Sequence, residues 1–463
     1  MMQLYNKTSQ EKFDVLRQEF EKFTFECFTI TTSEQSLNIV FHFSLDEKIH
    51  FKPETKLPFN QYFNKNNLPK KEDLNSIAFH MGLIELISYW KAACPKTIHI
   101  KPYNLTIAQQ SFWRKIYYFG LGEFFHTNKI EINYDDFFEF SFGNKLPFPK
   151  IDLVATNEVM IPIGGGKDSV VSLEIIKGMN FKAIPFIINP RGASWESALA
   201  AGYDENEIIS MSRSIDPQLL KLNQEGYLNG HTPFSAMLAF SGLLAAHCCK
   251  ISNMALSNEA SANEPTVIGT DINHQYSKSF EFETDFRNYV HQHISPNFNY
   301  YSLLRPLSEL QIAALFSKTD KYNKIFKSCN VGSKNNVWCC QCSKCLFTYI
   351  ILSAFLKEEK MIEIFGENLF QNEKLIDTLL ELSGQTEEKP FECVGTIEEV
   401  NIALCQIIRQ HNNSTLPLLL EKYSKSAFYQ KFNKINFKEQ LKNFNPEHYL
   451  SEEQFEYISK KLS

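Results

Sequence analysis

The expected fold rests on the stretch Val159-Met160-Ile161-Pro162-Ile163-Gly164-Gly165-Gly166-Lys167-Asp168-Ser169, which runs from apolar residues through glycines to a polar end. Val159–Ile163 has the length and composition of a buried strand, and a helix pattern follows the glycines as far as Gly178. Glycines let the backbone turn its N–H groups toward an anion, and the helix adds its positive N-terminal end. The order of strand, glycines and helix therefore predicts a phosphate-binding loop.

The spacing of this loop separates it from two other phosphate-binding motifs. A Walker A loop needs a longer spacing and a Lys before the Ser, and a dinucleotide fold needs a later glycine. The loop instead resembles the PP-loop of ATP pyrophosphatases, Ser-Gly-Gly-x-Asp-Ser, with Gly164 in place of the first Ser. The resemblance implies ATP and Mg²⁺ as cofactors, and Asp168 can hold the Mg²⁺ or cap the loop. The residues expected to bind the nucleotide are Gly164, Gly165, Gly166, Lys167, Asp168, Ser169 and, after the next strand, Asn189.

The residues around this loop alternate between strand and helix patterns. Such alternation predicts an α/β core with a parallel sheet and helices on both faces. The expected strands after Val159–Ile163 are Ala183–Ile188, Glu207–Met211 and Ile251–Leu256, with a helix at Thr232–Cys249. Ligands bind such sheets beyond the carboxyl ends of the strands. We therefore expect three polar loops to converge there, namely Gly164–Ser169, Asn189–Trp195 and Ser257–Glu264.

Two polar segments follow the last of these strands and carry the candidate chemistry. Ser257–Glu264 and Asn273–Ser279 bring together acids, amides, a His and a Lys, which suits proton transfer and the binding of polar groups. His231 and Trp195 are equally compatible with structural roles, and a buried inert thiol is the default interpretation of Cys393. The expected catalytic residues are His274, Glu259 and Lys278, and the expected substrate-binding residues are Arg191, Asn258, Asn263 and Glu264.

Cysteines crowd into one segment of the chain. Cys329, Cys339, Cys342 and Cys345 have spacings at which thiolates surround one tetrahedral Zn²⁺. Cys340 stands between two of these ligands and is the less suitable thiol, because adjacent ligands strain a tetrahedral site. The arrangement resembles the zinc site of the PP-loop enzyme that makes 7-cyano-7-deazaguanine. We expect a structural zinc ion here, because four thiolates leave no open position for a substrate.

Composition narrows the class of protein. The chain has 463 residues, of which 43% are hydrophobic and 22% charged, as in ordinary globular proteins. With 47 basic and 53 acidic residues, a net charge of −6 and no long basic run, no nucleic-acid partner is expected. Met1–Phe20 lacks the pattern of a secretory signal, and the most apolar stretches are expected to be buried helices. The expectation is a cytoplasmic protein with no membrane partner.

The pattern along the chain divides it into three expected regions. Residues 1–150 form an α+β region, with paired strands at Phe25–Thr31 and Leu37–Phe43 and helices at Ser76–Trp90 and Thr106–Phe119. Residues 151–360 form the PP-loop domain with the Cys-rich site, and residues 361–463 form a helical C-terminal region. In the last region, Thr396 with Glu399 predicts a capping box ahead of an apolar helix.

Several of these segments together resemble the MurL-type UDP-N-acetyl-α-D-muramoyl-L-alanyl-L-glutamate epimerases. The likeness rests on Gly164–Ser169, Ser257–Glu264, Asn273–Lys278, Trp338–Cys345 and Phe391–Gly395, and it covers about residues 155–400. It implies ATP- and Mg²⁺-dependent conversion of the terminal L-Glu of a UDP-MurNAc-dipeptide to D-Glu through an acyl-adenylate, with release of AMP and pyrophosphate during peptidoglycan precursor synthesis. Alternatives are a tRNA-modifying thiolase, an amide- or nitrile-forming ligase, and a zinc-stabilised scaffold that binds ATP without turnover.

Overall fold

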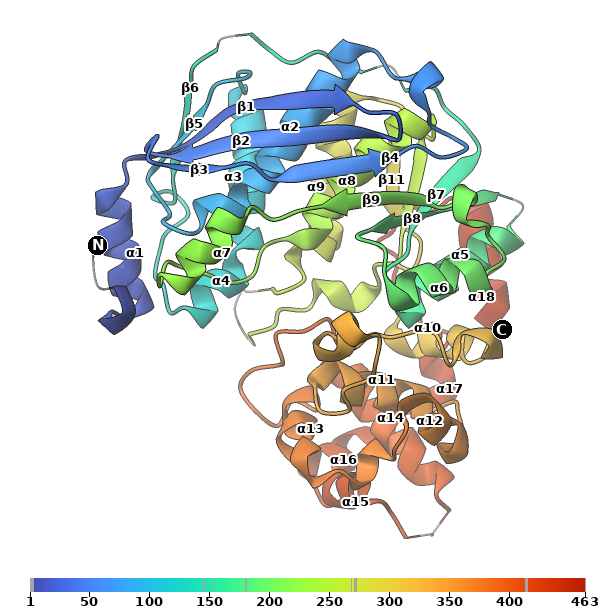
Figure 1. Ribbon diagram of the computed structural model, residues 1–463. Coiled ribbons are helices and arrows are strands. Elements are labelled where there is room, and N and C mark those ends of the chain that lie inside the picture. The colour runs from blue at the N-terminus through green and yellow to red at the C-terminus, as the bar shows by residue number, and fades with distance from the viewer. Residues whose placement is uncertain are drawn as a thin grey trace.

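The computed structural model describes residues 4–144, 146–151, 153–179, 181–267, 269, 273–412 and 415–462. One long sheet crosses the molecule, and a lobe of helices from the C-terminal part of the chain lies beside the carboxyl ends of several of its strands (Figure 1). None of the helices in the described residues is long and apolar enough to cross a membrane.

The sheet has eleven strands and joins two parts of the chain edge to edge. In its second half, β11, β10, β7, β8 and β9 are parallel neighbours in that order. Its first half runs β4, β2, β1, β5 and β6, with β3 paired to β2. The strands are β1 (Lys22–Thr32), β2 (Ser36–Leu45), β3 (Ile49–Phe51), β4 (Glu54–Pro58), β5 (Thr97–Ile100), β6 (Glu139–Phe142), β7 (Glu158–Pro162), β8 (Lys182–Ile188), β9 (Ile209–Arg213), β10 (Asn253–Leu256) and β11 (Asn299–Ser302).

The parallel arrangement expected for the middle of the chain is confirmed, but the whole sheet is mixed. β1, β2 and β4 pair antiparallel because short connections return the chain directly beside itself. β4 then pairs antiparallel with β9, where Thr55 lies opposite Arg213. The N-terminal strands therefore extend the parallel sheet instead of forming a sheet of their own, a continuity that no local pattern predicted.

Helices cover both faces of the parallel half, as expected. Alternate residues of β7 pack into different apolar clusters, with Met160 on one side and Val159 and Ile161 on the other. On the Met160 side lie α2 (Lys71–Trp90), α8 (Phe234–Cys249) and α9 (Phe280–Tyr289), and on the opposite side lie α5 (Lys167–Gly178), α6 (Gly192–Ala200) and α10 (Glu309–Phe316).

The other expected elements are present with small shifts of their ends. The N-terminal strands are β1 and β2, and the helices expected there are α2 and α3 (Ile107–Gly120). Residues after 361 are mainly helical, and the Thr396–Glu399 capping box is formed at α14. The division at residues 150 and 360 stays a prediction. The remaining helices are α1 (Ser9–Glu19), α4 (Gly122–Thr127), α7 (Pro217–Gln224), α11 (Ser343–Ser353), α12 (Glu358–Phe365), α13 (Ile376–Leu382), α14 (Ile397–Gln410), α15 (Leu418–Ser424), α16 (Ala427–Phe432), α17 (Phe437–Gln440) and α18 (Glu452–Leu462).

Candidate functional site

A cavity of about 550 Å³ lies beyond the carboxyl ends of β7, β8 and β10. The loops that follow these strands converge on it as expected, and segments before α11 and α14 close it from the C-terminal lobe. Its apolar walls include Leu238 and Leu256. The sequence-predicted residues that line it are Gly164, Gly166, Asp168, Ser169, Arg191, Asn258, Glu259, His274, Lys278 and the expected zinc ligand Cys329.

The glycine loop has a backbone that only glycine adopts without strain. Gly165 has φ of +86°, and a Cβ added there would lie 2.6 Å from the backbone nitrogen of Ser194. Gly166 then caps α5, whose N-terminal end carries the partial positive charge of the helix. The Ser169 hydroxyl donates to the Gly166 carbonyl at 3.0 Å. The loop therefore has the form of an anion cradle at a helix N-terminus.

Two neighbouring charged residues of the loop point to different places. Asp168 lines the cavity and is partly exposed, whereas Lys167 is buried and does not line the cavity. Lys167 forms ion pairs with Asp168, at 2.5 Å, and with the buried Glu309. Burial lowers the pKa of Lys167, but the two carboxylates outweigh that effect and raise it. The Lys167 side chain therefore anchors the start of α5 to α10 and leaves Asp168 as the charged side chain of the loop that faces the cavity.

Basic side chains from several elements line the same cavity. Arg191 follows β8, Lys278 lies in the loop segment before α9, and Lys344 lies in the first turn of α11. Lys327 lines it too, and its backbone N–H donates to the Gly165 carbonyl at 2.9 Å. Several positive charges around a glycine cradle suit the phosphates of a nucleotide or of a nucleotide sugar.

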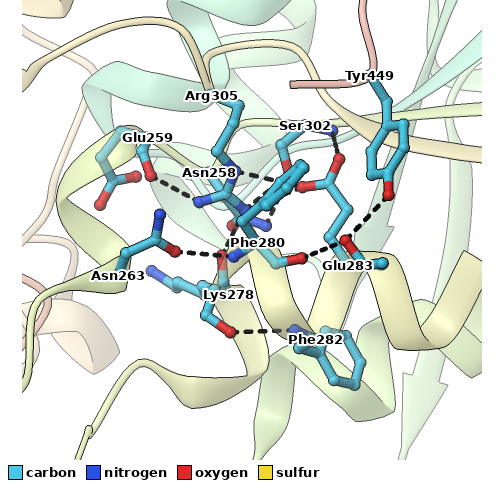
Figure 2. A network of polar contacts seen from close by, with 12 residues as sticks. Asn258, Glu259, Asn263, Lys278, Phe280, Phe282, Glu283, Ser302, Arg305 and Tyr449 are labelled. Carbon is cyan, nitrogen blue, oxygen red and sulfur yellow. Dashed lines mark hydrogen bonds and ion pairs between the residues drawn. The ribbon is translucent and has the colours of Figure 1, made fainter. Parts of the chain in front are cut away.

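A buried arginine ties the two polar site segments together. Figure 2 shows Arg305 reaching between them, and its guanidinium donates to the backbone carbonyls of Glu259, at 2.8 Å, and Lys278, at 2.5 Å. The same group pairs with the buried carboxylate of Glu283 at 3.0 Å. Asn258 donates to the Ser302 hydroxyl at 3.1 Å. Arg305 therefore fixes the backbone from which two candidate catalytic side chains extend.

Other predicted site residues hold loops next to the cavity without lining it. Asn189 has φ of +51° and accepts a hydrogen bond from the Arg213 backbone N–H at 2.8 Å. Asn263 accepts from the Phe280 backbone N–H at 2.8 Å, at the start of α9. Glu264 forms an ion pair with Lys389. The structure thus gives these three side chains local partners, and it does not bring them to the cavity wall.

Cys393 lines the cavity, although sequence reasoning took it by default for a buried inert thiol. Its sulfur lies 3.1 Å from Lys278 Nζ, and His274 lines the same cavity. Burial raises the pKa of the Cys393 thiol, but the charge of Lys278 and the nearby His274 imidazole lower it to about 6. The inert thiol taken as the default for Cys393 does not fit these contacts. Its loop is unremarkable in composition, and the signal for it was the family resemblance that Phe391–Gly395 carries.

Behind His274 lies a carboxylate that the sequence also left unnoticed. His274 Nδ1 donates to Glu123 Oε2 at 2.5 Å, and His231 Nδ1 lies 3.1 Å from the same oxygen. These separations are those of hydrogen bonds, and they are shorter than the roughly 3.4 Å between neighbouring nitrogen and oxygen ligands of a tetrahedral metal. Burial lowers the pKa of His231 to about 4, so this imidazole stays neutral. Burial also lowers the pKa of His274, but Cys393 and Glu123 outweigh it and raise the value to about 9.

The four cysteines expected to bind zinc lie together beside the cavity. Their sulfur atoms are 3.9 Å apart for Cys329 and Cys342, 3.8 Å for Cys339 and Cys345, and 3.5 Å for Cys342 and Cys345. Zn–S bonds of about 2.3 Å in a tetrahedron place sulfur atoms about 3.8 Å apart, so the donor set fits one Zn²⁺. Cys340 has φ of +56° and turns its thiol to the Phe365 carbonyl, outside this cluster.

Two family models match this chain, and both describe domains of one family. The model described as the MurL N-terminal domain matches residues 15–303, and that of the MurL C-terminal domain matches residues 322–434.

Curated relatives carry one name, UDP-N-acetyl-alpha-D-muramoyl-L-alanyl-L-glutamate epimerase. The protein of a Micromonospora species is 34% identical over 72% of this chain and 75% of its own length. That of Xanthomonas oryzae pv. oryzae is 34% identical over 70% and 72%, and that of Salinispora tropica is 32% identical over 73% and 74%. No solved structure gives a significant match. With both domain models matched and these identities over most of its length, the chain belongs to the MurL family.

Proposed function

We propose that this protein uses ATP to convert the terminal L-Glu of UDP-MurNAc-L-Ala-L-Glu to D-Glu in peptidoglycan precursor synthesis, through an acyl-adenylate. One observation carries the proposal beyond the names of the relatives. A single cavity is lined by a glycine cradle, by basic side chains and by the proton-transfer candidates His274, Glu259 and Lys278. Phosphate binding and proton transfer in one cavity are what an epimerase that first activates a carboxylate requires.

The activation step follows from the chemistry of the substrate. Removal of the α-proton beside a free carboxylate is difficult, because the resulting carbanion would lie next to a negative charge. Transfer of AMP to that carboxylate cancels the charge and releases pyrophosphate. The backbone of Gly164–Gly166 and the Ser169 hydroxyl would hold the pyrophosphate, and Asp168 would hold a Mg²⁺ that neutralises phosphate charge. Lys278 and Arg191 would bind anionic parts of the substrate.

Inversion requires a proton to leave the α-carbon on one face and to return on the other. His274 and Glu259 are the candidates taken from the sequence, and both line the cavity. Water then cleaves the adenylate and restores the carboxylate. The Cys cluster would hold a structural Zn²⁺ and so fix the segment that carries Lys327 and Lys344 to the cavity wall.

The test is turnover in D₂O with ATP, Mg²⁺ and the UDP-linked dipeptide. The expected result is deuterium at the Glu α-carbon, a D-Glu product with an intact UDP group, and stoichiometric AMP and pyrophosphate. Free L-Glu should fail as a substrate, because binding energy from the UDP-sugar positions the carboxylate. ATP cleavage without deuterium at the α-carbon would contradict epimerisation and would indicate ligation or hydrolysis instead. Turnover with a tRNA instead of the dipeptide would assign a thiolase.

A further inference from the structure

Glu123 hydrogen-bonds His274, and His274 and Cys393 both line the cavity. Glu123 comes from α4, His274 from the segment before α9, and Cys393 from the loop before α14. Their order of carboxylate, imidazole and thiol is the arrangement by which enzymes orient and activate a nucleophile or base. Of these three residues, Cys393 is the one that contacts Lys278, whose Nζ lies 3.1 Å from the sulfur.

His274 itself is poorly placed to take a proton from a substrate. Its Nδ1 is occupied by Glu123 at 2.5 Å, and its charge is stabilised by the nearby Cys393 sulfur as well. With a pKa raised to about 9 by these two partners, its imidazole is protonated at neutral pH and has no free lone pair. The geometry therefore makes His274 a fixed cation that stabilises a thiolate, and His274 is not the base.

We propose that Cys393 is the catalytic residue that exchanges a proton with the Glu α-carbon, and that His274 and Glu123 are positioning residues that hold it as a thiolate. The assignment rests on the proposed function. Lys278 adds a second positive charge on the sulfur and also faces the negative charge of Glu259 across the cavity wall.

The proton balance of the step is complete with Cys393 and one molecule of solvent water. The Cys393 thiolate takes the α-hydrogen as a proton, and the electron pair of the C–H bond moves into the activated carbonyl to give an enolate. A water molecule gives a proton to the opposite face, which forms the new C–H bond and leaves hydroxide. The proton that Cys393 carries then neutralises this hydroxide, so the thiolate and the water molecule are restored. No oxidant, reductant or covalent bond to the protein is needed.

The first experiment separates adenylation from proton transfer in the full-length protein. Exchange of labelled pyrophosphate into ATP, dependent on the dipeptide substrate, reports adenylation, and deuterium uptake at the Glu α-carbon reports proton transfer. For Cys393→Ser we expect exchange within a few-fold of the wild type and deuterium uptake reduced by about 100-fold or more. The matched control is Cys27→Ser, an exposed thiol on β1 far along the chain from the cavity. Deuterium uptake by Cys393→Ser within a few-fold of the wild type would overturn the assignment.

A second measurement uses the wild-type protein, so it does not depend on the folding of a variant. Iodoacetamide alkylation is followed by peptide mass spectrometry across a pH series. Reaction at Cys393 should rise with a midpoint near 6, the pKa held down by Lys278, His274 and Lys344, with Glu392 as the adjoining acid. A midpoint near the ordinary thiol value of about 8.5 would overturn the thiolate assignment. A substrate adduct on Cys393 during turnover would make Cys393 a nucleophile and overturn its role as a base. If instead the wild-type protein takes up no deuterium at all, the proposed function fails and the alkylation result still decides whether Cys393 is a thiolate.

Discussion

Arg305 and Glu283 form an ion pair at 3.0 Å in which both side chains are almost completely buried. The same guanidinium supports the backbone of Glu259 and of Lys278, so one buried cation joins the core to both polar site segments (Figure 2). Removal of one partner from such a pair leaves an uncompensated buried charge, which is costly.

Replacing Arg305 should therefore affect both stability and the site. Arg305→Met is expected to lower the free energy of unfolding by about 3–5 kcal/mol, because Glu283 and two backbone carbonyls lose their donor. Urea unfolding measures this loss, and the double variant Arg305→Met/Glu283→Gln should recover part of it. Arg287→Met, which removes a half-buried arginine of α9 outside the cavity wall, is the control and should cost less. Equal losses for the two single variants would contradict a special role for Arg305.

Position 165 should tolerate no side chain, whereas position 164 should tolerate one. Gly165→Ala would place a Cβ at φ of +86° and 2.6 Å from the Ser194 nitrogen, so the cradle must shift and binding of ATP should be lost. Apart from its chain neighbours, no atom of the described residues lies within 4 Å of a Cβ added at Gly164, so Gly164→Ser should fold normally and restore the hydroxyl of the usual PP-loop. Calorimetric titration with ATP and Mg²⁺ compares the two. Normal ATP binding by Gly165→Ala would show that the loop geometry is not required.

Asp168 and Ser169 should be needed for pyrophosphate release but not for folding. Asp168→Ala removes the loop carboxylate that faces the cavity, and Ser169→Ala removes a hydroxyl beside the cradle, so each should lower pyrophosphate release by about 100-fold or more. Thermal melting should stay close to that of the wild type. Ser172→Ala is the matched control, since that serine is buried on the same helix and its hydroxyl has no partner among the described residues. Near-normal pyrophosphate release by both site variants would refute the PP-loop assignment.

The purified protein should contain about one Zn²⁺ per chain, held by the four clustered thiolates. Cys342→Ala and Cys345→Ala should each lose the metal and lower the melting temperature, as measured by elemental analysis and thermal unfolding. Cys340→Ala should keep its zinc, because the Cys340 thiol turns away to the Phe365 carbonyl. Freshly purified wild-type protein without zinc would refute the site.

The pH dependence of deuterium uptake at the α-carbon should follow the ionisation of the Cys393 thiol. Protonation of Cys393 below its pKa of about 6 removes the base, so the rate should fall as pH drops through 6. From there to about 9, the pKa of His274, the thiolate and the imidazolium coexist and the rate should be level. His274→Asn removes the cation and should move the acid limb upward by more than one pH unit. His231→Asn should leave that limb in place, because His231 is already neutral there.

Local sequence was sufficient to predict the features whose atoms are close along the chain. The glycine cradle consists of a strand, three glycines and a helix in succession. Backbone sterics require a glycine at position 165 of this stretch. The cysteine cluster spans Cys329–Cys345, where short spacings bring the sulfur atoms together. Alternating strands and helices predicted the parallel half of the sheet, and the rule for its carboxyl ends predicted which loops meet.

Only the tertiary structure decided which side chains touch across long separations. Cys393 lies 115 residues from Lys278, and His274 lies 151 residues from Glu123, so no spacing or periodicity relates them. The pairing of β4 with β9 depends likewise on the meeting of two exposed strand edges. Thiol ionisation depends on the charges nearby, and the charges that lower the pKa of Cys393 come from two other segments of the chain, which carry His274 with Lys278 and Lys344. The sequence by itself thus determined the cradle and the cysteine cluster, whereas the folded chain alone determined that Cys393 is held beside two cations.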